Sequence, residues 1–315
     1  MDARSRIVIR RPVAKEAGGQ ARQGARFRRR TAGAWRAPGL LWQRAFRVEE
    51  GGMSEASTMN RLQGKVALVT GLANKRSIAY GIAEDFAAQG AQLAIAYQRL
   101  DKEGTEEKIR RTTEELKPAL LVPMDVNDPQ SVTAMYGAIR ERFGKLHVLV
   151  HAIASAKRQE LGGRYSDITL DGYLYALNVS AFSLIALTRE ARTLMSEGGS
   201  ILTLTYIGSE RAVLHYNVMG SAKAALEANV RYLARELGPE GIRVNAISAG
   251  PIRTLSASGI QDFLDLLHQA AELSALKRNV TVEEVAHTAT FLAGDGASGI
   301  TGQVIHVDGG YNIFG

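Results

Sequence analysis

Residues 66–98 read VALVTGLANKRSIAYGIAEDFAAQGAQLAIAYQ and decide the fold. The stretch opens with the apolar, β-branched run Val66–Thr70, which is typical of a buried strand. A loop that starts at Gly71 follows, and apolar residues then recur at helical spacing until Gly90, a residue type that often ends helices. The run Gln92–Tyr97 predicts a second strand. A strand, a glycine-led loop, a helix and a strand in this order are typical of the first βαβ unit of a dinucleotide-binding fold.

The same alternation continues along the chain. Further strands are predicted at 119–124, 146–153, 200–206, 242–248 and 303–307, and further helices at 102–116, 130–143, 170–195, 218–237 and 282–293. Seven near-continuous apolar strands that alternate with helices predict a parallel sheet covered on both faces. We therefore expect a single α/β domain over residues 59–315, a Rossmann-type, doubly wound, seven-stranded parallel sheet.

Composition excludes several classes of protein. Of the 315 residues, 45% are hydrophobic, which is enough for a sizeable core. The chain has no cysteine, so disulfides, a thiolate nucleophile and a cysteine-bound metal are excluded. We expect no metal site among the six histidines. No apolar run reaches the ~18 residues of a membrane span, and an intracellular protein that neither crosses nor binds a membrane is the expectation.

The basic character of the chain belongs to its N-terminal part. Residues 1–52 carry 13 Lys and Arg and 4 Asp and Glu, a net charge of +9. Since the whole chain has a net charge of +7, the remaining residues have a net charge of −2. The folded part therefore gives no reason to expect nucleic-acid binding. We interpret residues 1–58 as a basic extension outside the domain, either disordered or misassigned to the protein.

Two functional interpretations of the extension stay open. An Arg-rich, acid-poor segment is also typical of an organelle transit peptide, or of a tail that binds nucleic acid or a membrane surface. Glu49-Glu50-Gly51-Gly52 directly before Met53 has codons compatible with a purine-rich ribosome-binding site. We therefore favour a bacterial translation start at Met53 or Met59, and cytoplasmic localisation over organelle targeting.

The loop after the first strand predicts a phosphate site without the usual G-x-G-x-x-G fingerprint. Gly71 supplies the tight turn, but positions 73 and 76 are Ala and Arg. Ser77 precedes the helix and is a suitable N-cap residue. The free backbone N–H groups beside it would face a pyrophosphate at the positive end of the helix. A plain structural N-cap is the alternative, and the βαβ context favours the cofactor site.

The ends of the next three strands should complete this site, because ligands of such sheets bind outside the carboxyl ends of the strands. Gln98 ends the second strand where NAD-dependent dehydrogenases usually carry an acid. Since Gln98 is uncharged, it favours NADH without excluding NADPH. Asp125 and Val126 follow the third strand, where an adenine would lie. Ile153 ends the fourth strand, beneath the adenosine and the nicotinamide ribose.

The stretch TYIGSERAVLHYNVMGSAK, residues 205–223, carries the candidate chemistry. Tyr216 and Lys223 are seven residues apart, so on a helix they share one face. None of the ten tyrosines has a lysine four residues later. For Tyr216 that position, 220, is Gly. A tyrosine near a fixed positive charge is a plausible proton donor for a reductase. Tyr206 lies ten residues before Tyr216, and a strand-end tyrosine bonded to backbone is its alternative interpretation.

Four stretches resemble one family: VTGLANKRSIAYGIA at 69–83, HAIASA at 151–156, LTLTYIGSERAVLHYNVMGSAKAALEANVRYLARELGPEGIRVNAISAGPIRTLSASGI at 202–260 and GQVIHVDGGY at 302–311. They resemble the bacterial NADH-dependent enoyl-acyl-carrier-protein reductases, a divergent branch of the short-chain dehydrogenase/reductases. The resemblance spans about residues 60–315. It implies a cytoplasmic homotetramer that acts on an enoyl chain bound to acyl carrier protein. Ala152 and Ala154 stand where the family often has Ser and Gly or Ala, respectively.

The resemblance also implies roles for individual residues. Tyr206, Tyr216 and Lys223 would be catalytic, Ala156 would line the acyl pocket, and residues 255–273 would form a mobile substrate-binding loop. The residues implied to contact the dinucleotide are Gly71, Ser77, Ile78, Gln98, Asp125, Val126, Ile153, Lys223, Ile252, Arg253, Thr254, Leu255 and Ser256.

The tyrosine–lysine spacing favours reduction of C=C over C=O. Residues seven apart are separated by ~10.5 Å along a helix, against ~6 Å for residues four apart. If Lys223 stays at the nicotinamide ribose, Tyr216 lies roughly one turn further out. In an enoyl thioester, negative charge develops on the thioester oxygen, two bonds further from the hydride acceptor than in a ketone. A ketone or alcohol dehydrogenase and a non-catalytic dinucleotide-binding protein are the alternatives.

Overall fold

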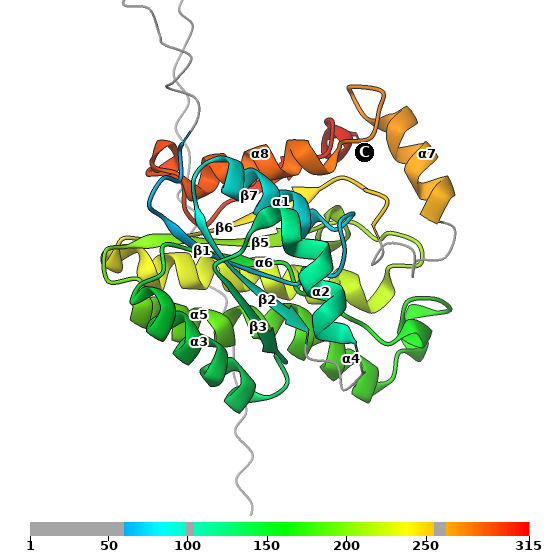
Figure 1. The fold of residues 1–315 in the computed structure, drawn as a ribbon. Helices are drawn as coiled ribbons and strands as arrows, with labels where there is room; N and C mark the ends of the chain where they lie inside the picture. The colour runs from blue at the N-terminus through cyan, green and yellow to red at the C-terminus, as the bar shows by residue number, and fades with distance from the viewer. Residues whose placement is uncertain (1–59, 99–103, 255–262, 315) are drawn as a thin grey trace, which may run out of the picture. The chain divides into compact units, whose positions relative to one another are not determined.

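The computed structural model describes residues 60–98, 104–254 and 263–314 (Figure 1), so the predicted N-terminal extension lies outside the described residues. Seven strands form one sheet in the order β3-β2-β1-β4-β5-β6-β7, and every neighbouring pair is parallel. The strands are β1 Val66–Thr70, β2 Gln92–Gln98, β3 Leu120–Met124, β4 Val148–His151, β5 Gly199–Thr205, β6 Ile242–Ala249 and β7 Val304–Val307. The predicted fold class is confirmed.

Helices cover both faces of this sheet (Figure 1). Their bounds are α1 Ile78–Ala88, α2 Thr105–Thr113, α3 Pro129–Phe143, α4 Leu170–Leu177, α5 Ser183–Ala191, α6 Asn217–Leu237, α7 Phe263–Leu273 and α8 Val282–Ala293. On one face, α1 and α8 pack against each other and bury Ile82, Phe86 and Val285 over the sheet. On the other face, α3, α5 and α6 bury Ile139, Leu184 and Leu226. The order reverses between β1 and β4, and this topological switch point is where such sheets bind ligands.

The long helix predicted at 170–195 contains a break. Between α4 and α5 lies a π-helical turn, Asn178–Phe182, in which the backbone N–H of Ser183 reaches the carbonyl of Asn178. The Ser183 hydroxyl donates to the carbonyl of Val179 at 2.6 Å. By length and composition alone the stretch Leu170–Leu194 could cross a membrane. Its residues Leu184 and Leu187 are instead fully buried against the sheet, as in the core helix of a globular domain.

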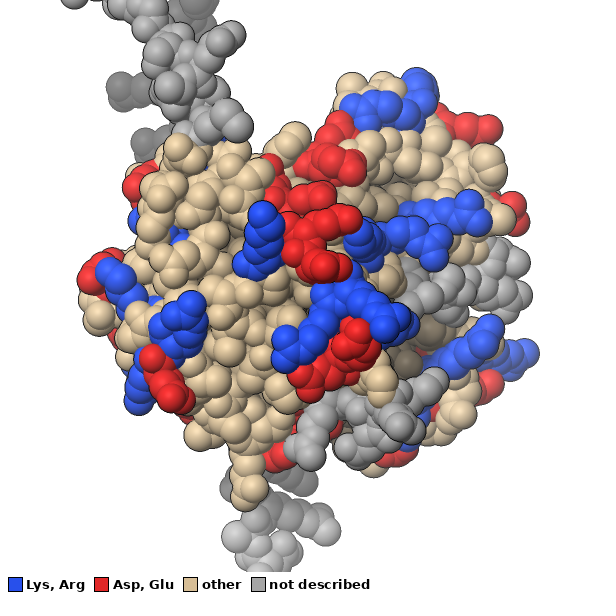
Figure 2. Space-filling model, viewed as in Figure 1, with Lys and Arg blue, Asp and Glu red and all other residues tan. Residues whose placement is uncertain are grey.

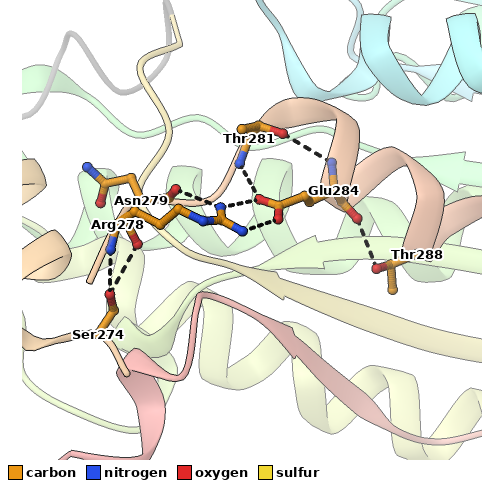
Figure 3. Close-up of polar contacts among 6 residues, drawn as sticks. All are labelled: Ser274, Arg278, Asn279, Thr281, Glu284 and Thr288. Carbon is orange, nitrogen blue, oxygen red and sulfur yellow. Dashed lines mark hydrogen bonds and ion pairs between the residues drawn. The ribbon is translucent and has the colours of Figure 1, made fainter. Parts of the chain in front are cut away.

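The predicted substrate-binding loop is partly helical. Residues 255–262 lie outside the described residues, and from Phe263 the chain forms α7. Figure 3 shows how the connection from α7 to α8 is held. The Arg278 guanidinium binds both oxygens of the Glu284 carboxylate at 2.9 and 2.7 Å. Glu284 and Thr281 form a reciprocal capping box at the start of α8.

This junction is also tied to α7 itself. The Ser274 hydroxyl bonds to both backbone groups of Arg278, and the side chain of Asn279 donates to the carbonyl of Leu267 within α7. Arg278 holds the pKa of the Glu284 carboxyl at about 2, well below its usual range. The C-terminal end of α7 is therefore anchored to α8 by charged and capping contacts.

Candidate active site

A cleft of about 1000 Å³ opens at the carboxyl ends of the strands. The predicted residues that line it are Gly71, Ser77, Ile78, Gln98, Asp125, Val126, Ile153, Ala156, Tyr206, Tyr216, Lys223, Ile252 and Thr254. Arg253 is exposed and is not among the lining residues. Leu255 and Ser256 lie outside the described residues. The structure thus brings together side chains from positions up to 183 residues apart, from Gly71 to Thr254.

The loop between β1 and α1 has the geometry of a phosphate site. Gly71 has φ +78°, and a Cβ at this position would collide with the carbonyl of Ala152 at the end of β4. The Ser77 hydroxyl accepts a hydrogen bond from the backbone N–H of Tyr80 at 3.2 Å and donates to the carbonyl of Asn74 at 2.7 Å. Ser77 is therefore the N-cap, as predicted. The N-terminus of α1 reaches the cleft through Ser77 and Ile78, and such helix ends favour anionic groups.

The adenine end of the cleft is organised by an amide network. Oδ1 of Asp125 accepts hydrogen bonds from the backbone and the side-chain amide of Asn127, at 2.9 and 3.0 Å. The amide oxygen of Asn127 in turn accepts from Asn178 at the π-helical turn, at 2.9 Å. Asn178 therefore supports the loop after β3. These contacts and the cleft volume fit a bound dinucleotide.

The two tyrosines form one packed pair. Tyr206 follows the last residue of β5, and Tyr216 occupies the N-cap position of α6. Their ring centroids lie 5.0 Å apart in an edge-on arrangement. Burial raises the pKa of both hydroxyls, so both are protonated at neutral pH. Neither hydroxyl bonds to another described residue, so the backbone bond of the alternative interpretation of Tyr206 is absent from this part of the chain.

Lys223 is a buried cation on α6, seven residues after the N-cap Tyr216. Lys223 is only 5% exposed, and its Nζ donates a hydrogen bond to the carbonyl of Leu204 at 2.7 Å. Burial lowers the pKa of Lys223 to about 8, and the nearby Glu227 opposes this effect. A group with this pKa is about nine-tenths charged at pH 7. The expectation of a charged lysine therefore holds.

Two glycines explain why the lysine cannot sit four residues after the tyrosine. A Cβ on Gly220 would lie 2.8 Å from the carbonyl oxygen of Gly208, in the 3₁₀ turn η7, Ile207–Ser209. A Cβ on Gly208 would lie 2.6 Å from the ring of Tyr216. The turn η7 thus packs directly on the first turns of α6. No side chain fits at position 220 without displacing the turn that follows Tyr206.

Sequence reasoning missed part of the cleft wall. Ser155 and Tyr175 both line the cleft, and their hydroxyls lie 3.2 Å apart. Most of the other missed residues are apolar, and they include Leu161, Val179, Val213 and Met219, whereas Phe263 and Leu266 belong to the predicted substrate-binding segment 255–273. Met219 was detectable, because it lies between Tyr216 and Lys223 at helical spacing. The helical spacing of Phe263, Leu266, Leu267 and Ala270 was a signal for α7.

A family model described as enoyl-(acyl carrier protein) reductase matches residues 71–312. The chain belongs to this family. It is 50% identical over 254 residues to the enoyl-[acyl-carrier-protein] reductase [NADH] FabI of Synechocystis sp., covering 81% of this chain and 98% of that protein.

Solved structures agree with this assignment. The enoyl-acyl carrier protein reductase of Bacillus cereus with NADP+ and indole naphthyridinone matches with a TM-score of 0.79 and 50% identity, over 82% of this chain and all of that chain. The enoyl-(acyl-carrier-protein) reductase of Anaplasma phagocytophilum in complex with NAD matches with a TM-score of 0.77 and 44% identity, over 82% and 97% of the two chains. Both neighbours are members of the same family.

The packing of η7 on α6 generates a stability prediction. We expect Gly220→Ala to lower the free energy of unfolding by about 1–3 kcal/mol, because the added methyl overpacks the Gly208 carbonyl. Displacement of η7 should also move Tyr206 and Tyr216 and lower turnover. Thermal unfolding and steady-state rates measure both effects. Gly137→Ala in α3 is the matched control, since its methyl meets no atom within 4 Å and should be neutral or stabilising. Equal stability of the two variants would contradict the packing argument.

Proposed function

We propose that this enzyme uses NADH to reduce the C2=C3 double bond of trans-2-enoyl thioesters carried by acyl carrier protein, in type II fatty acid synthesis. The observation that carries the proposal is that Tyr216 and Lys223 line one dinucleotide-sized cleft while Gly220 occupies the position of a Tyr-x3-Lys lysine. The name of the Synechocystis relative, which specifies NADH and an enoyl-acyl-carrier-protein substrate, supports the cofactor and the substrate.

Tyr216 is suited to stabilise the enolate of the thioester. Its raised pKa keeps the hydroxyl protonated, and this hydroxyl has no competing bond to a described residue. When bound, NADH supplies the hydride that enters at C3. The Tyr216 hydroxyl donates a hydrogen bond to the thioester oxygen as negative charge develops there, and a proton that enters at C2 completes the reduction. A hydrogen-bond donor fixed in a water-poor site stabilises developing negative charge more strongly than the same donor does in water.

Lys223 is suited to bind the cofactor and to supply positive charge. The ammonium group has three donors, and one of them is used on the carbonyl of Leu204. The others can bind ribose hydroxyls at the cleft wall. The charge also favours the enolate over the neutral thioester. Since its pKa is about 8, this role weakens as the pH rises above 8.

Tyr206 and Ala156 have supporting roles in this proposal. The ring of Tyr206 packs against that of Tyr216 and limits the movement of the phenol. Ala156 lies past the end of β4 and offers a small side chain to the cleft, where an acyl chain needs room. The described half of the substrate-binding segment, α7, contributes Phe263 and Leu266 as an apolar wall.

The alternatives account for fewer of these features. A ketone or alcohol dehydrogenase with a Tyr-x3-Lys pair is not compatible with Gly220. A non-catalytic dinucleotide-binding protein has no need for protonated phenols that face the cleft. On the face drawn in Figure 2, acidic and basic side chains are interspersed, and α2 pairs Arg110 with Glu106 and Arg111 with Glu107. This mixture differs from the continuous basic stripe that is typical of a nucleic-acid-binding face.

The proposal extends to partner, place and assembly. The acyl chain would arrive on acyl carrier protein, and the bacterial origin of the similar proteins supports the cytoplasm as the site of action. We further propose a homotetramer. The helical stretch from α4 exposes Leu170, Leu174 and Phe182, which are 74%, 55% and 47% exposed. An apolar surface of this kind is typical of a subunit interface.

The substrate class is tested by following NADH oxidation at 340 nm. We expect oxidation with crotonyl-CoA, because the C=C bond is conjugated with a thioester, and much slower oxidation with acetoacetyl-CoA. NADPH in place of NADH should support a slower rate. Faster turnover of acetoacetyl-CoA than of crotonyl-CoA would favour the carbonyl reductase instead. No oxidation with either thioester, on CoA or on acyl carrier protein, would favour the non-catalytic alternative.

Two variants separate the roles of the tyrosine and the lysine. Tyr216→Phe should lower kcat at least tenfold with little change in the dissociation constant of NADH, because the phenol acts on the thioester. Lys223→Ala should weaken NADH binding, since it removes a cofactor donor. Stopped-flow rates and NADH fluorescence titrations measure the two quantities. An equal loss of NADH affinity in both variants would refute this division.

The assembly is tested by light scattering coupled to size-exclusion chromatography. We expect a mass of about four chains, as dihedral tetramers are common among closed oligomers. Leu174→Glu should reduce this mass, because it places a charge in the apolar surface of the α4 stretch. A monomeric wild-type protein at micromolar concentration would exclude the tetramer.

A further inference from the structure

Glu227 is a buried carboxylate that the proposed mechanism does not use. It lies on α6 one helical turn after Lys223 and is only 6% exposed. Its Oε1 accepts a hydrogen bond from the Thr205 hydroxyl at 2.6 Å. Within the described ranges, Glu227 makes no ion pair shorter than 4 Å. Burial of an ionised carboxylate is costly without compensation, so its presence beside the active-site lysine needs a physical reason.

Two hydrogen bonds of opposite direction join α6 to the end of β5. Lys223 donates to the carbonyl of Leu204, and the hydroxyl of Thr205 donates to Glu227. Leu204 and Thr205 are consecutive residues, and Lys223 and Glu227 are consecutive turns of one helix face. Tyr206 follows directly. The two hydrogen bonds therefore hold Lys223, Glu227 and the backbone that leads into Tyr206 together as one unit.

The charges around Lys223 come from few groups. On α6 the acid is Glu227, and the two tyrosines are protonated. On β4, His151 is fully buried between the hydroxyls of Thr203 and Ser183, at 2.8 Å from each. Burial lowers the pKa of His151 to about 3, so this ring is neutral at physiological pH. Glu227 is thus the group that counteracts the effect of burial on Lys223.

We propose that Glu227, held by Thr205, is a positioning residue that keeps Lys223 protonated and fixed on the Leu204 carbonyl in the buried site that NADH enters. The inference rests on the proposed function, which assigns Lys223 to the cofactor. A lysine that loses its counter-charge in a buried site gives up its proton more readily. It then has one donor fewer and no positive charge for the ribose and the enolate.

The test is the pH dependence of NADH binding to the full chain, measured by NADH fluorescence between pH 6 and 9.5. The wild type should lose affinity as Lys223 deprotonates near pH 8. Glu227→Gln keeps the size and an acceptor for Thr205 but removes the charge. Its midpoint should fall by about one pH unit, because an opposite charge nearby typically shifts a pKa by one or more units. At pH 8 the dissociation constant should then rise about fivefold, with little change at pH 6.

Controls separate this role from a structural one. Glu236→Gln removes an exposed acid from the same helix and should leave the midpoint unchanged. Thr205→Val should move the midpoint in the same direction as Glu227→Gln, and Thr205→Ser should restore it. These variants also decide the question if Glu227→Gln folds poorly in thermal unfolding.

Two results would count against the inference in different ways. A uniform loss of affinity at every pH, with the midpoint unmoved in Glu227→Gln and Thr205→Val, would show that the acid has only a structural role. A wild-type protein that does not bind NADH at any pH would overturn the proposed function, and this inference with it.

Discussion

The parallel pairing of β1 with β4 is the constraint on which the rest of the structure depends. The sheet grows outward in both directions from this pair, so the helices that leave β1 and β4 cover opposite faces. The loops that follow the two strands must diverge, and the cleft is the space between them. Gly71 makes the divergence tight, because only a residue without a Cβ can pass the carbonyl of Ala152 at positive φ. The position of the cleft therefore follows from strand order.

The reactive end of the cleft depends on one helix. α6 carries Lys223 and Glu227 on its buried face and has Tyr216 at its N-terminus. A buried lysine and a buried glutamate are each unfavourable alone. Their hydrogen bonds to consecutive residues of β5 offset part of that cost and place both groups at defined depth. The apolar side of the same helix, through Leu226 and Val230, belongs to the main core. Packing in the core thus fixes the chemistry in the cleft.

The sequence predicted the sheet well because most strands form a nearly continuous apolar run, and β1, β4 and β6 are buried almost throughout. It also predicted the Ser77 cap, and most of the predicted site residues line the cleft. The bounds of α7 were not predicted, because the resemblance implied a loop over residues 255–273 although apolar residues recur there at helical spacing. Ala270 is the single buried residue of α7 within the described chain. The π-helical turn at Asn178 was missed because the helical spacing of apolar residues continues across it, from Leu177 to Ala181 and Leu184. Arg253 was placed by resemblance alone, and its side chain is exposed.

The exact start of α6 shows what separates this site from that of a carbonyl reductase. A tyrosine four residues before the lysine would lie within regular helix and need no special backbone. Here Tyr216 lies between His215 and Asn217, which have φ of +60° and +23°. Such conformations cost of order 1–3 kcal/mol each for residues other than glycine. The side chain of Asn217 donates to the carbonyls of Gly162 and Gly163 at 3.0 and 3.3 Å, which holds the turn in place. The strained turn places the phenol at the end of the helix instead of on its flank. Position 220 is left to a glycine that packs on η7, so a lysine four residues after Tyr216 has no room.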